Sequence, residues 1–538
     1  MGATANPAAN RRPEAGYQET VRLLADPAAY AERPRRVELV ETHISCVFLT
    51  DRRAYKLKKP VRYEFLDFTT ADRRRHACQE EVRLNRRLAP HVYRRVAPVT
   101  IDDHGRLALD GRGRSVDWVV EMCRLPADAM LDHLIRAGRL TDEGIQQLAV
   151  VLTAFYQQAP PLTLRPGQYR CGIESHVLAN LDELLSPDHQ LPAIAVRRVH
   201  AGQMRLLKLA PEALDQRVCD GRIVDGHGDL RPEHVCLLSP PVVYDCIEFD
   251  PLLRQIDVAD ELSFFAMECD RLHAHDVGRQ VIAEYCRASH DDPPAPLMDF
   301  YKCYRACVRA KVAALRGRQI SGVAAAEARS EAREYLQLAD RYVAGLGRPA
   351  LVVVRGISGT GKSTLARSIA EALGAQWLST DVIRRELLGR SRREAAYGQG
   401  IYTDERRRHV YQEMNRRAEM SLSERVPVVM DGTFLSTAAR REAVALAERH
   451  GAVALMVHCH CADDLARRRV EMRRQRKSSP SEVRPELLAV QKISEQSDPP
   501  GVFSTDVDAS ECLTAQSAAV LRALRQLDPV SGWGRTPD

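Results

Sequence analysis

The sequence lacks long apolar runs and is poor in aromatic residues. No stretch reaches the roughly 18 apolar residues that a membrane-spanning helix needs, and the first residues contain no apolar segment typical of a secretory signal. Three tryptophans and 5% aromatic residues provide no stacking platform for single-stranded nucleic acid. The 14 cysteines follow no repeated spacing, which in a chain of this length is typical of reduced thiols. We therefore expect a cytoplasmic protein.

Lysine is also scarce, at nine of the 78 basic residues. The formal net charge is +6, and acids and bases balance through residue 347, so the whole excess lies in the last third of the chain. Such an excess is typical of proteins that bind nucleic acid or other phosphate-rich partners. An arginine-rich, lysine-poor composition by itself reflects codon bias, and it marks the few lysines as positions where arginine would not serve.

A chain of 538 residues is too long for one hydrophobic core and predicts two domains. In the first, strands beginning near Val37 give way to a mostly helical region, as in an α+β fold. In the second, continuous apolar strands alternate with helices, which predicts a parallel, doubly wound α/β sheet. The expected divisions are a polar extension (1–36), a first domain (37–345), a second domain (346–530) and a tail (531–538).

A phosphate-binding motif opens the second domain. GISGTGKS at residues 356–363 follows the apolar strand ALVVVRG, begins a helix and fits the pattern G-x-x-x-x-G-K-[ST]. Its backbone N–H groups and the helix N-terminus would hold phosphate oxygens, Lys362 would neutralise the β- and γ-phosphates, and Ser363 would bind Mg²⁺. The predicted nucleotide-binding residues are Gly356, Ser358, Gly359, Thr360, Gly361, Lys362, Ser363 and Thr364.

Two acidic residues end strands of the same domain, where the sites of open α/β sheets lie. Asp381 follows QWLST and stands one helical turn before Arg384, so the carboxylate can take a proton from an acceptor hydroxyl while Arg384 holds an anionic part of the acceptor. The alternative is that Asp381 caps the helix VIRRELL. Asp431 follows VPVVM and is a second candidate ligand for Mg²⁺.

A strongly basic run follows at residues 467–477, with seven basic side chains. Arg469 and Arg473 are four residues apart and share a helix face, which suits a lid that closes over transferring phosphates. The alternative interpretations are a solvated basic helix and a surface that binds a polyanion.

The segments GISGTGKST, LSTDVIRREL, VVMDGTF and this basic run resemble the P-loop small-molecule and polynucleotide kinases, which include polynucleotide 5′-hydroxyl kinases, zeta-toxin-like kinases and gluconate or antibiotic kinases. The resemblance covers roughly residues 349–500. It implies that Asp381, the aspartate of D-x-x-R, is the general base and that Arg384 lies on the acceptor side. It leaves the acceptor open.

The first domain contains HGDLRPEH at residues 227–234, which reads like a kinase catalytic loop. Asp229 would orient and deprotonate an acceptor hydroxyl, His234 stands where the loop places a metal ligand, and Asp245 after PVVY would supply a second metal contact. Upstream, Lys56 lies on a strand as a phosphate-pairing lysine does, with Lys58 as the alternative on the same face. Glu81, on the following helix, would pair with that lysine.

HGDLRPEHV and IEFDPLLRQIDVADEL resemble the aminoglycoside-phosphotransferase-like branch of the protein-kinase superfamily, over roughly residues 37–320. In that family Asp257 would match an architectural aspartate. The tandem resembles bacterial proteins in which such a domain is fused to a P-loop ATPase. One departure is His234, which stands in place of the metal-binding asparagine, and imidazole is a poor ligand for Mg²⁺. Either the domain is an active kinase with altered metal geometry, or it binds a ligand and regulates the second domain.

The sequence thus predicts a bifunctional phosphotransferase that uses ATP and Mg²⁺ to phosphorylate a hydroxyl of a small molecule. The first alternative is a polynucleotide 5′-hydroxyl kinase, with nucleic acid as partner and the first domain helping to bind that nucleic acid. The second is a nucleotide-gated regulatory protein whose first domain is catalytically impaired.

Overall fold

The computed structural model describes residues 11–63, 66–388, 404–475 and 486–528. The chain divides into two compact units, the first made of Met1–Thr163 and Asp220–Pro293, the second of Leu164–Cys219 and Pro294–Asp538. Helices from the middle of the chain therefore group with the C-terminal sheet. The domain boundary after residue 345 stays a prediction, because the units group segments by packing rather than by sequence order.

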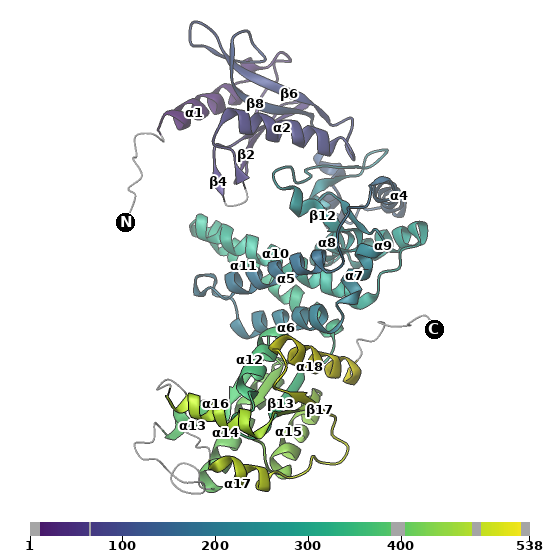
Figure 1. Ribbon diagram of the computed structural model, residues 1–538. Helices are drawn as coiled ribbons and strands as arrows, with labels where there is room; N and C mark the ends of the chain where they lie inside the picture. The colour runs from purple at the N-terminus through teal and green to yellow at the C-terminus, as the bar shows by residue number, and fades with distance from the viewer. Residues whose placement is uncertain (1–10, 64–65, 389–403, 476–485, 529–538) are drawn as a thin grey trace. The chain divides into compact units, whose positions relative to one another are not determined.

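The first unit contains a six-stranded antiparallel sheet in the order β1-β2-β3-β8-β6-β7 (Figure 1). Helix α2 (Ala71–Asn85) follows strand β3, begins at Thr70, whose hydroxyl accepts the Arg73 N–H, and buries Glu81 and Leu84. The strands are β1 Glu38–Glu41, β2 Ser45–Leu49, β3 Arg53–Lys58, β6 Tyr93–Ile101, β7 Leu107–Leu109 and β8 Arg114–Cys123, with a separate pair β4 Arg62–Tyr63 and β5 Leu66–Asp67.

The first 36 residues contain a helix that their polar composition conceals. In α1 (Arg11–Ala25), Tyr17 and Leu24 are spaced seven residues apart and therefore share a face. Both are buried in a cluster with Phe48 and Leu57 of the sheet. Part of the expected polar extension thus belongs to the core of the first unit.

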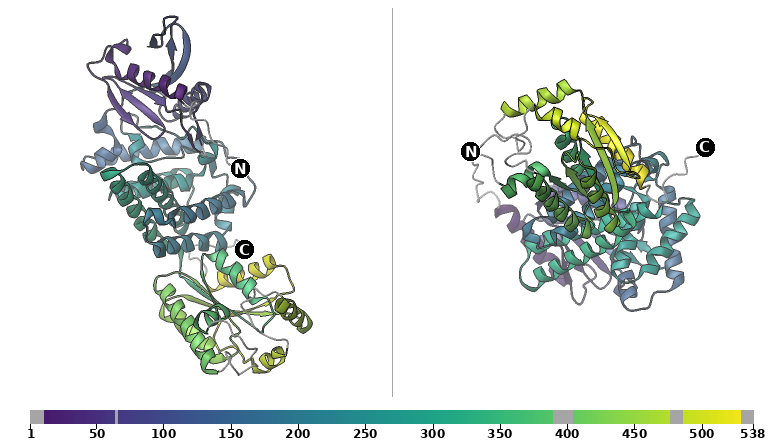
Figure 2. Two further views of the ribbon diagram at one scale, coloured as in Figure 1. Left: turned by 90° about the vertical axis from the view of Figure 1, so that its left-hand side faces the viewer. Right: turned by 90° about the horizontal axis from the view of Figure 1, so that it is seen from below.

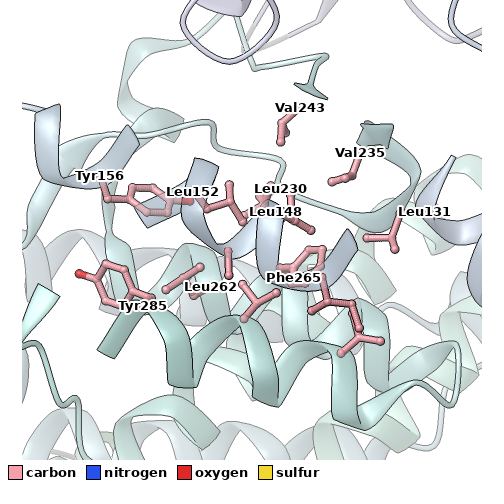
Figure 3. Packing of buried hydrophobic residues seen from close by; sticks show 14 of the residues in the cluster. Leu131, Leu148, Leu152, Tyr156, Leu230, Val235, Val243, Leu262, Phe265 and Tyr285 are labelled. Atoms are coloured by element: carbon pink, nitrogen blue, oxygen red, sulfur yellow. The ribbon is translucent and has the colours of Figure 1, made fainter. Parts of the chain in front are cut away.

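The remainder of the first unit is mainly helical and holds the catalytic-loop motif in its core. Leu230, inside that motif, is fully buried in a cluster with Leu148, Leu262 and Phe265 (Figure 3). This burial anchors the loop between Asp229 and Arg231. The elements are α3 Leu131–Arg136, α4 Asp142–Gln158, α8 Val258–Arg271, α9 His275–Ser289, the antiparallel pair β9 Ile223–Asp225 with β12 Gln255–Asp257, and the hairpin β10 Val235–Cys236 with β11 Val242–Val243.

The second unit contains a five-stranded, all-parallel sheet in the order β14-β15-β13-β16-β17 (Figures 1 and 2). Its strands are β13 Ala350–Arg355, β14 Gln376–Ser379, β15 Val428–Asp431, β16 Val453–His460 and β17 Ser504–Asp508. Its helices are α5 Gln168–Leu184, α6 Ala193–Leu209, α7 Glu212–Cys219, α10 Ala295–Gln319, α11 Gly322–Val343, α12 Lys362–Leu373, α13 Thr380–Leu388, α14 Asp404–Ser423, α15 Thr437–Arg449, α16 Asp463–Gln475, α17 Leu487–Ser494 and α18 Leu513–Leu527.

Both faces of the parallel sheet are buried. Val352 and Val354 of β13 belong to the cluster with α12 and α18, whereas Leu351 and Val353 belong to the cluster with α14 and α15. This doubly wound arrangement explains the continuous apolar strand ALVVVR. The predicted fold class is confirmed: an α+β kinase-like fold precedes an α/β P-loop fold. Strand β17 escaped prediction because STDVD is polar.

In the described part of the chain, no helix is long and apolar enough to cross a membrane. The 14 cysteines are free thiols.

Candidate active sites

The phosphate-binding loop has the backbone that its glycines predict. Gly356, Gly359 and Gly361 adopt φ angles of 132°, 85° and 93°, in the region that favours glycine. A Cβ atom on Gly356 would lie 2.3 Å from the Cys459 carbonyl oxygen, and one on Gly359 would lie 2.5 Å from that of Ala466. The loop therefore requires glycine for close approach as well as for conformation.

A cleft of about 750 Å³ lies beside this loop and brings together residues from four elements. Lys362 and Ser363 come from α12, Asp381 and Arg384 from α13, and Asp431 from the end of β15. Ser358, Gly359 and Gly361 also line it. The sequence predicted all of these residues, and parallel strands that end at one edge of a sheet explain why they meet.

Asp431 has the character of a cation ligand. It is buried, and its Oδ2 atom accepts no hydrogen bond from the described protein. Burial raises the pKa of Asp431, while the nearby Lys362 ammonium opposes that rise. A buried carboxylate oxygen without a donor, next to the Ser363 hydroxyl, fits the oxygen ligands that Mg²⁺ requires.

Asp381 and Arg384 form an ion pair, with Arg384 Nη1 2.5 Å from Asp381 Oδ1. Helix α13 begins at Thr380, so Asp381 lies inside the first turn rather than at the cap position that the alternative interpretation required. The Lys362 ammonium turns back to its own loop and donates to the Ile357 carbonyl at 2.6 Å.

Arg469 does not line this cleft but lies next to Gly361, which does. Its Nη2 donates to the Ala509 carbonyl at 3.0 Å, and its side chain lines a second hollow of about 820 Å³ together with Gly361 and Thr364. Arg469 thus lies beside the phosphate-binding loop, and its expected contact with transferring phosphates stays a prediction. Helix α16 includes Arg473, but the side chain of Arg473 and residues 476–485 lie outside the described residues.

Among the lining residues that were not predicted, two carry polar side chains from other helices. Arg407 of α14 adds a cation to the lining, and Gln491 of α17 accepts the backbone N–H of Ser358 at 2.8 Å. Neither belongs to a recognisable motif. In the second hollow, Gln516 and Leu513 of α18 were missed as well.

In the first unit, Lys56 and Lys58 share one face of β3 and share one partner, Glu81. Lys56 Nζ lies 2.8 Å from Glu81 Oε1 and 2.6 Å from Asp245 Oδ1. Lys58 Nζ lies 2.6 Å from Glu81 Oε2 and also binds Glu248. Burial opposes the charged form of Lys56, but the carboxylates of Asp245 and Glu81 outweigh it and raise the pKa of Lys56. Lys56 is the lysine that reaches Asp245.

Arg231 neutralises the carboxylate of the catalytic-loop motif. Its Nε lies 3.1 Å from Asp229 Oδ1, and its Nη1 bonds Glu233 at 2.6 Å. The His234 ring donates through Nδ1 to the Asp229 carbonyl at 2.8 Å, so its Nε2 lone pair accepts from Arg231 Nη2 at 3.0 Å. Both nitrogens of His234 are therefore engaged.

These contacts do not fit a metal site of the predicted composition. His234 Nε2 lies 3.7 Å from Asp245 Oδ2, Asp245 is bonded to Lys56, and Asp229 faces Arg231. Across the described ranges, no group of three or more His, Cys, Asp or Glu side chains is arranged to hold a metal ion. The expected Mg²⁺ ligands His234 and Asp245 are close together, but protein cations occupy the positions beside the carboxylates.

Glu261 of α8 holds the catalytic-loop backbone and was missed in the sequence. Its carboxylate accepts the N–H groups of His227, at 2.9 Å, and Gly228, and the Tyr156 hydroxyl donates to it at 2.9 Å. Asp257, for which the resemblance implied an architectural role, caps α8 by accepting the Ala259 N–H.

Residues 351–495 match the family model described as an AAA domain. The chain is 34% identical over 427 residues to the uncharacterized protein Rv2004c of Mycobacterium tuberculosis, an alignment that covers 78% of this chain and 82% of that protein. The matched residues fall in the second domain, where the sequence predicted a P-loop fold.

Two solved structures are also similar to parts of the chain. A sugar kinase from Janibacter is 20% identical and covers 33% of this chain and 94% of its own, with a TM-score of 0.27. A choline/ethanolamine kinase family protein from Mesorhizobium loti is 10% identical and covers 60% of this chain and 99% of its own, with a TM-score of 0.35.

Proposed function

The chain belongs to the family of the mycobacterial protein Rv2004c, and on that premise we propose that it is an ATP-dependent phosphotransferase acting on a hydroxyl of a small molecule. The observation that carries the proposal is the single cleft lined by Lys362, Ser363, Asp381, Arg384 and Asp431. It combines a phosphate-binding loop with a carboxylate base and an arginine.

The proposed step is an in-line displacement. The acceptor oxygen attacks the γ-phosphorus and forms a new P–O bond, its proton passes to Asp381, and the bond to the β-phosphate oxygen breaks with its electron pair leaving on ADP. Arg384 orients Asp381 through their ion pair and faces an anionic acceptor. Lys362, which now bonds a loop carbonyl, turns to the phosphates when they replace that carbonyl as its partner.

Ser363 and Asp431 are the residues that would hold Mg²⁺, which would neutralise charge on the phosphates when bound. We place the rest of the nucleotide in the hollow lined by Gly361, Thr364 and Arg469, because that hollow adjoins the phosphate-binding loop.

Labelled ATP and the full chain test this function against a panel of sugars, aminoglycosides, nucleosides and 5′-hydroxyl oligonucleotides. We expect transfer to a small molecule. With Lys56→Met present, so that only the P-loop site is titrated, Lys362→Ala should lose ATP binding, and Asp381→Asn should keep ATP binding while transfer falls roughly 10²- to 10⁴-fold. Unchanged transfer in the double variant Asp381→Asn with Asp229→Asn would refute the assigned base. Transfer only to the oligonucleotide, weakened by salt, would instead favour a polynucleotide kinase.

For the first unit, the contacts of Arg231 favour a second candidate function. A guanidinium beside Asp229 and an imidazole in place of the usual amide ligand suit a nucleotide-sensing domain that regulates the P-loop kinase. In this function the domain binds nucleotide through Lys56 without phosphoryl transfer. Transfer that persists in Asp381→Asn and disappears on adding Asp229→Asn would instead show an active first domain.

A further inference from the structure

Gln491 is built into the wall of the phosphate cleft. Its side chain is buried, lines the cleft, and accepts the Ser358 N–H through Oε1 at 2.8 Å. A backbone N–H can only donate, so the carboxamide oxygen must face the loop. The NH₂ group of Gln491 is therefore left to donate a hydrogen bond into the cleft. It donates to no acceptor among the described residues.

Helix α17, which carries Gln491, is fixed to the strand that feeds the phosphate-binding loop. Arg355, the last residue of β13, bonds Glu495 at 2.8 Å and Asp498 at 2.6 Å. Arg440 of α15, fully buried, donates to the Gln496 carbonyl at 2.6 Å. Because the same strand positions both the loop and α17, Gln491 keeps its place without further ordering.

The charge of the cleft also favours a neutral donor at this position. Lys362, Arg384 and Arg407 supply cations, whereas Asp381 and Asp431 supply carboxylates. A glutamate at position 491 would accept the Ser358 N–H equally well but would repel a phosphate. A carboxamide alone combines an acceptor for the loop with a donor for an anion.

We propose that Gln491 binds the phosphoryl group being transferred, through its NH₂ group, while Ser358 holds its carbonyl oxygen. The inference rests on the proposed kinase function and adds a phosphoryl-binding residue to it. A fixed donor aimed at a group whose charge shifts during transfer stabilises the transition state and discriminates ATP from ADP.

The test compares ATP and ADP binding by calorimetry in the full chain carrying Lys56→Met, so that only the P-loop site is titrated. We expect Gln491→Glu to weaken ATP binding about 10- to 100-fold and ADP binding less than about 2-fold, because only ATP has the γ-phosphate. Gln491→Ala should weaken ATP binding less than Gln491→Glu, since it removes the donor without adding a charge.

A merely structural role predicts the reverse order. If Gln491 only holds the loop, Gln491→Glu keeps the Ser358 bond and should bind ATP more tightly than Gln491→Ala, with ATP and ADP affected equally. Either of those results would overturn the inference, and thermal unfolding of Gln491→Glu at the parent Tm would show that the fold is retained. Failure of the proposed function is recognised separately, because Lys362→Ala would then leave ATP binding unchanged.

Discussion

Lys56 Nζ lies 2.6 Å from Asp245 Oδ1, an ion pair that joins strand β3 to the segment after β11. The neighbouring Lys58 lies on the same face of β3, yet its partners are Glu81 and Glu248, and its side chain is fully buried. The two lysines therefore have separate roles. Lys56 faces the nucleotide-binding position that we propose, and Lys58 neutralises carboxylates in the interior.

We predict that Lys58→Met destabilises the protein more than Lys56→Met. Removal of Lys58 leaves Glu248 buried without a cation and should lower the free energy of unfolding by about 3–5 kcal/mol. Removal of Lys56 leaves Glu81 paired with Lys58, and Asp245, whose side chain is 40% exposed, can be hydrated. Urea unfolding measures both changes. Adding Glu248→Gln to Lys58→Met should recover part of the loss, and no recovery would contradict the buried-pair explanation.

Arg231 yields a prediction about metal dependence in the first unit. With Lys362→Ala blocking the P-loop site, we expect nucleotide binding to the first unit to persist in EDTA, because Arg231 and Lys56 already neutralise Asp229 and Asp245. Arg231→Gln should weaken binding in EDTA about 10-fold and make it partly dependent on Mg²⁺, as measured by calorimetry. Arg271→Gln is the matched control, since Arg271 pairs with Glu233 and Glu268. If nucleotide binding by Lys362→Ala with Arg231 intact strictly required Mg²⁺, this prediction would be contradicted.

The residues predicted from the sequence are those whose roles follow from local pattern. Glycine spacing identifies the loop at residues 356–363. The position directly after apolar strands identifies Asp381 and Asp431. Lys56 and Glu81 required only a strand, a helix and their order. Each of these inferences uses a few consecutive residues and the rule that parallel strands end at one edge.

The missed residues depend on partners far away in the chain. Gln491 acquires its role from Ser358, 133 residues earlier, and a single glutamine has no pattern to mark it. Glu261 holds the loop at His227, 34 residues earlier, because the packing of α8 brings its carboxylate to that backbone. Arg440 was missed as well, because it is one of many arginines in the sequence and no pattern marks it. In the fold its side chain is fully buried.

We predict that Arg440→Met loosens α17 and weakens ATP binding without changing any residue of the cleft. The guanidinium supplies hydrogen bonds to the carbonyls of Gln496 and Ser497 and lies 3.3 Å from Asp498. Leaving these buried acceptors unpaired should cost about 3 kcal/mol of unfolding free energy. Arg441→Met, at the exposed neighbouring position, is the control and should change stability by less than about 0.5 kcal/mol. Equal effects of the two substitutions in urea unfolding would contradict the assigned role.

His227 makes the stability of the first unit depend on pH. Burial lowers the pKa of His227 to about 4 from 6.5, and its contacts require the neutral ring: Nε2 donates to the Tyr244 carbonyl at 2.9 Å, while Nδ1 accepts the Asp229 N–H. Between these pH values the unfolded chain binds a proton that the folded chain does not. The free energy of unfolding therefore falls as pH falls from 6.5 towards 4, by about 1.4 kcal/mol per pH unit and about 3 kcal/mol in total.

Urea unfolding of the wild type and His227→Asn across this range measures that dependence as a difference between the two proteins. His200, whose pKa burial also lowers to about 4, contributes equally to both and cancels. We expect His227→Asn to be less stable at pH 7 and to lose less stability on acidification, because asparagine does not titrate. His91→Asn, at an exposed position, should keep the wild-type slope. Parallel pH profiles for wild type and His227→Asn would mean that His227 binds its proton as readily in the folded protein as in the unfolded chain, and the Nδ1 contact to Asp229 would then be wrong.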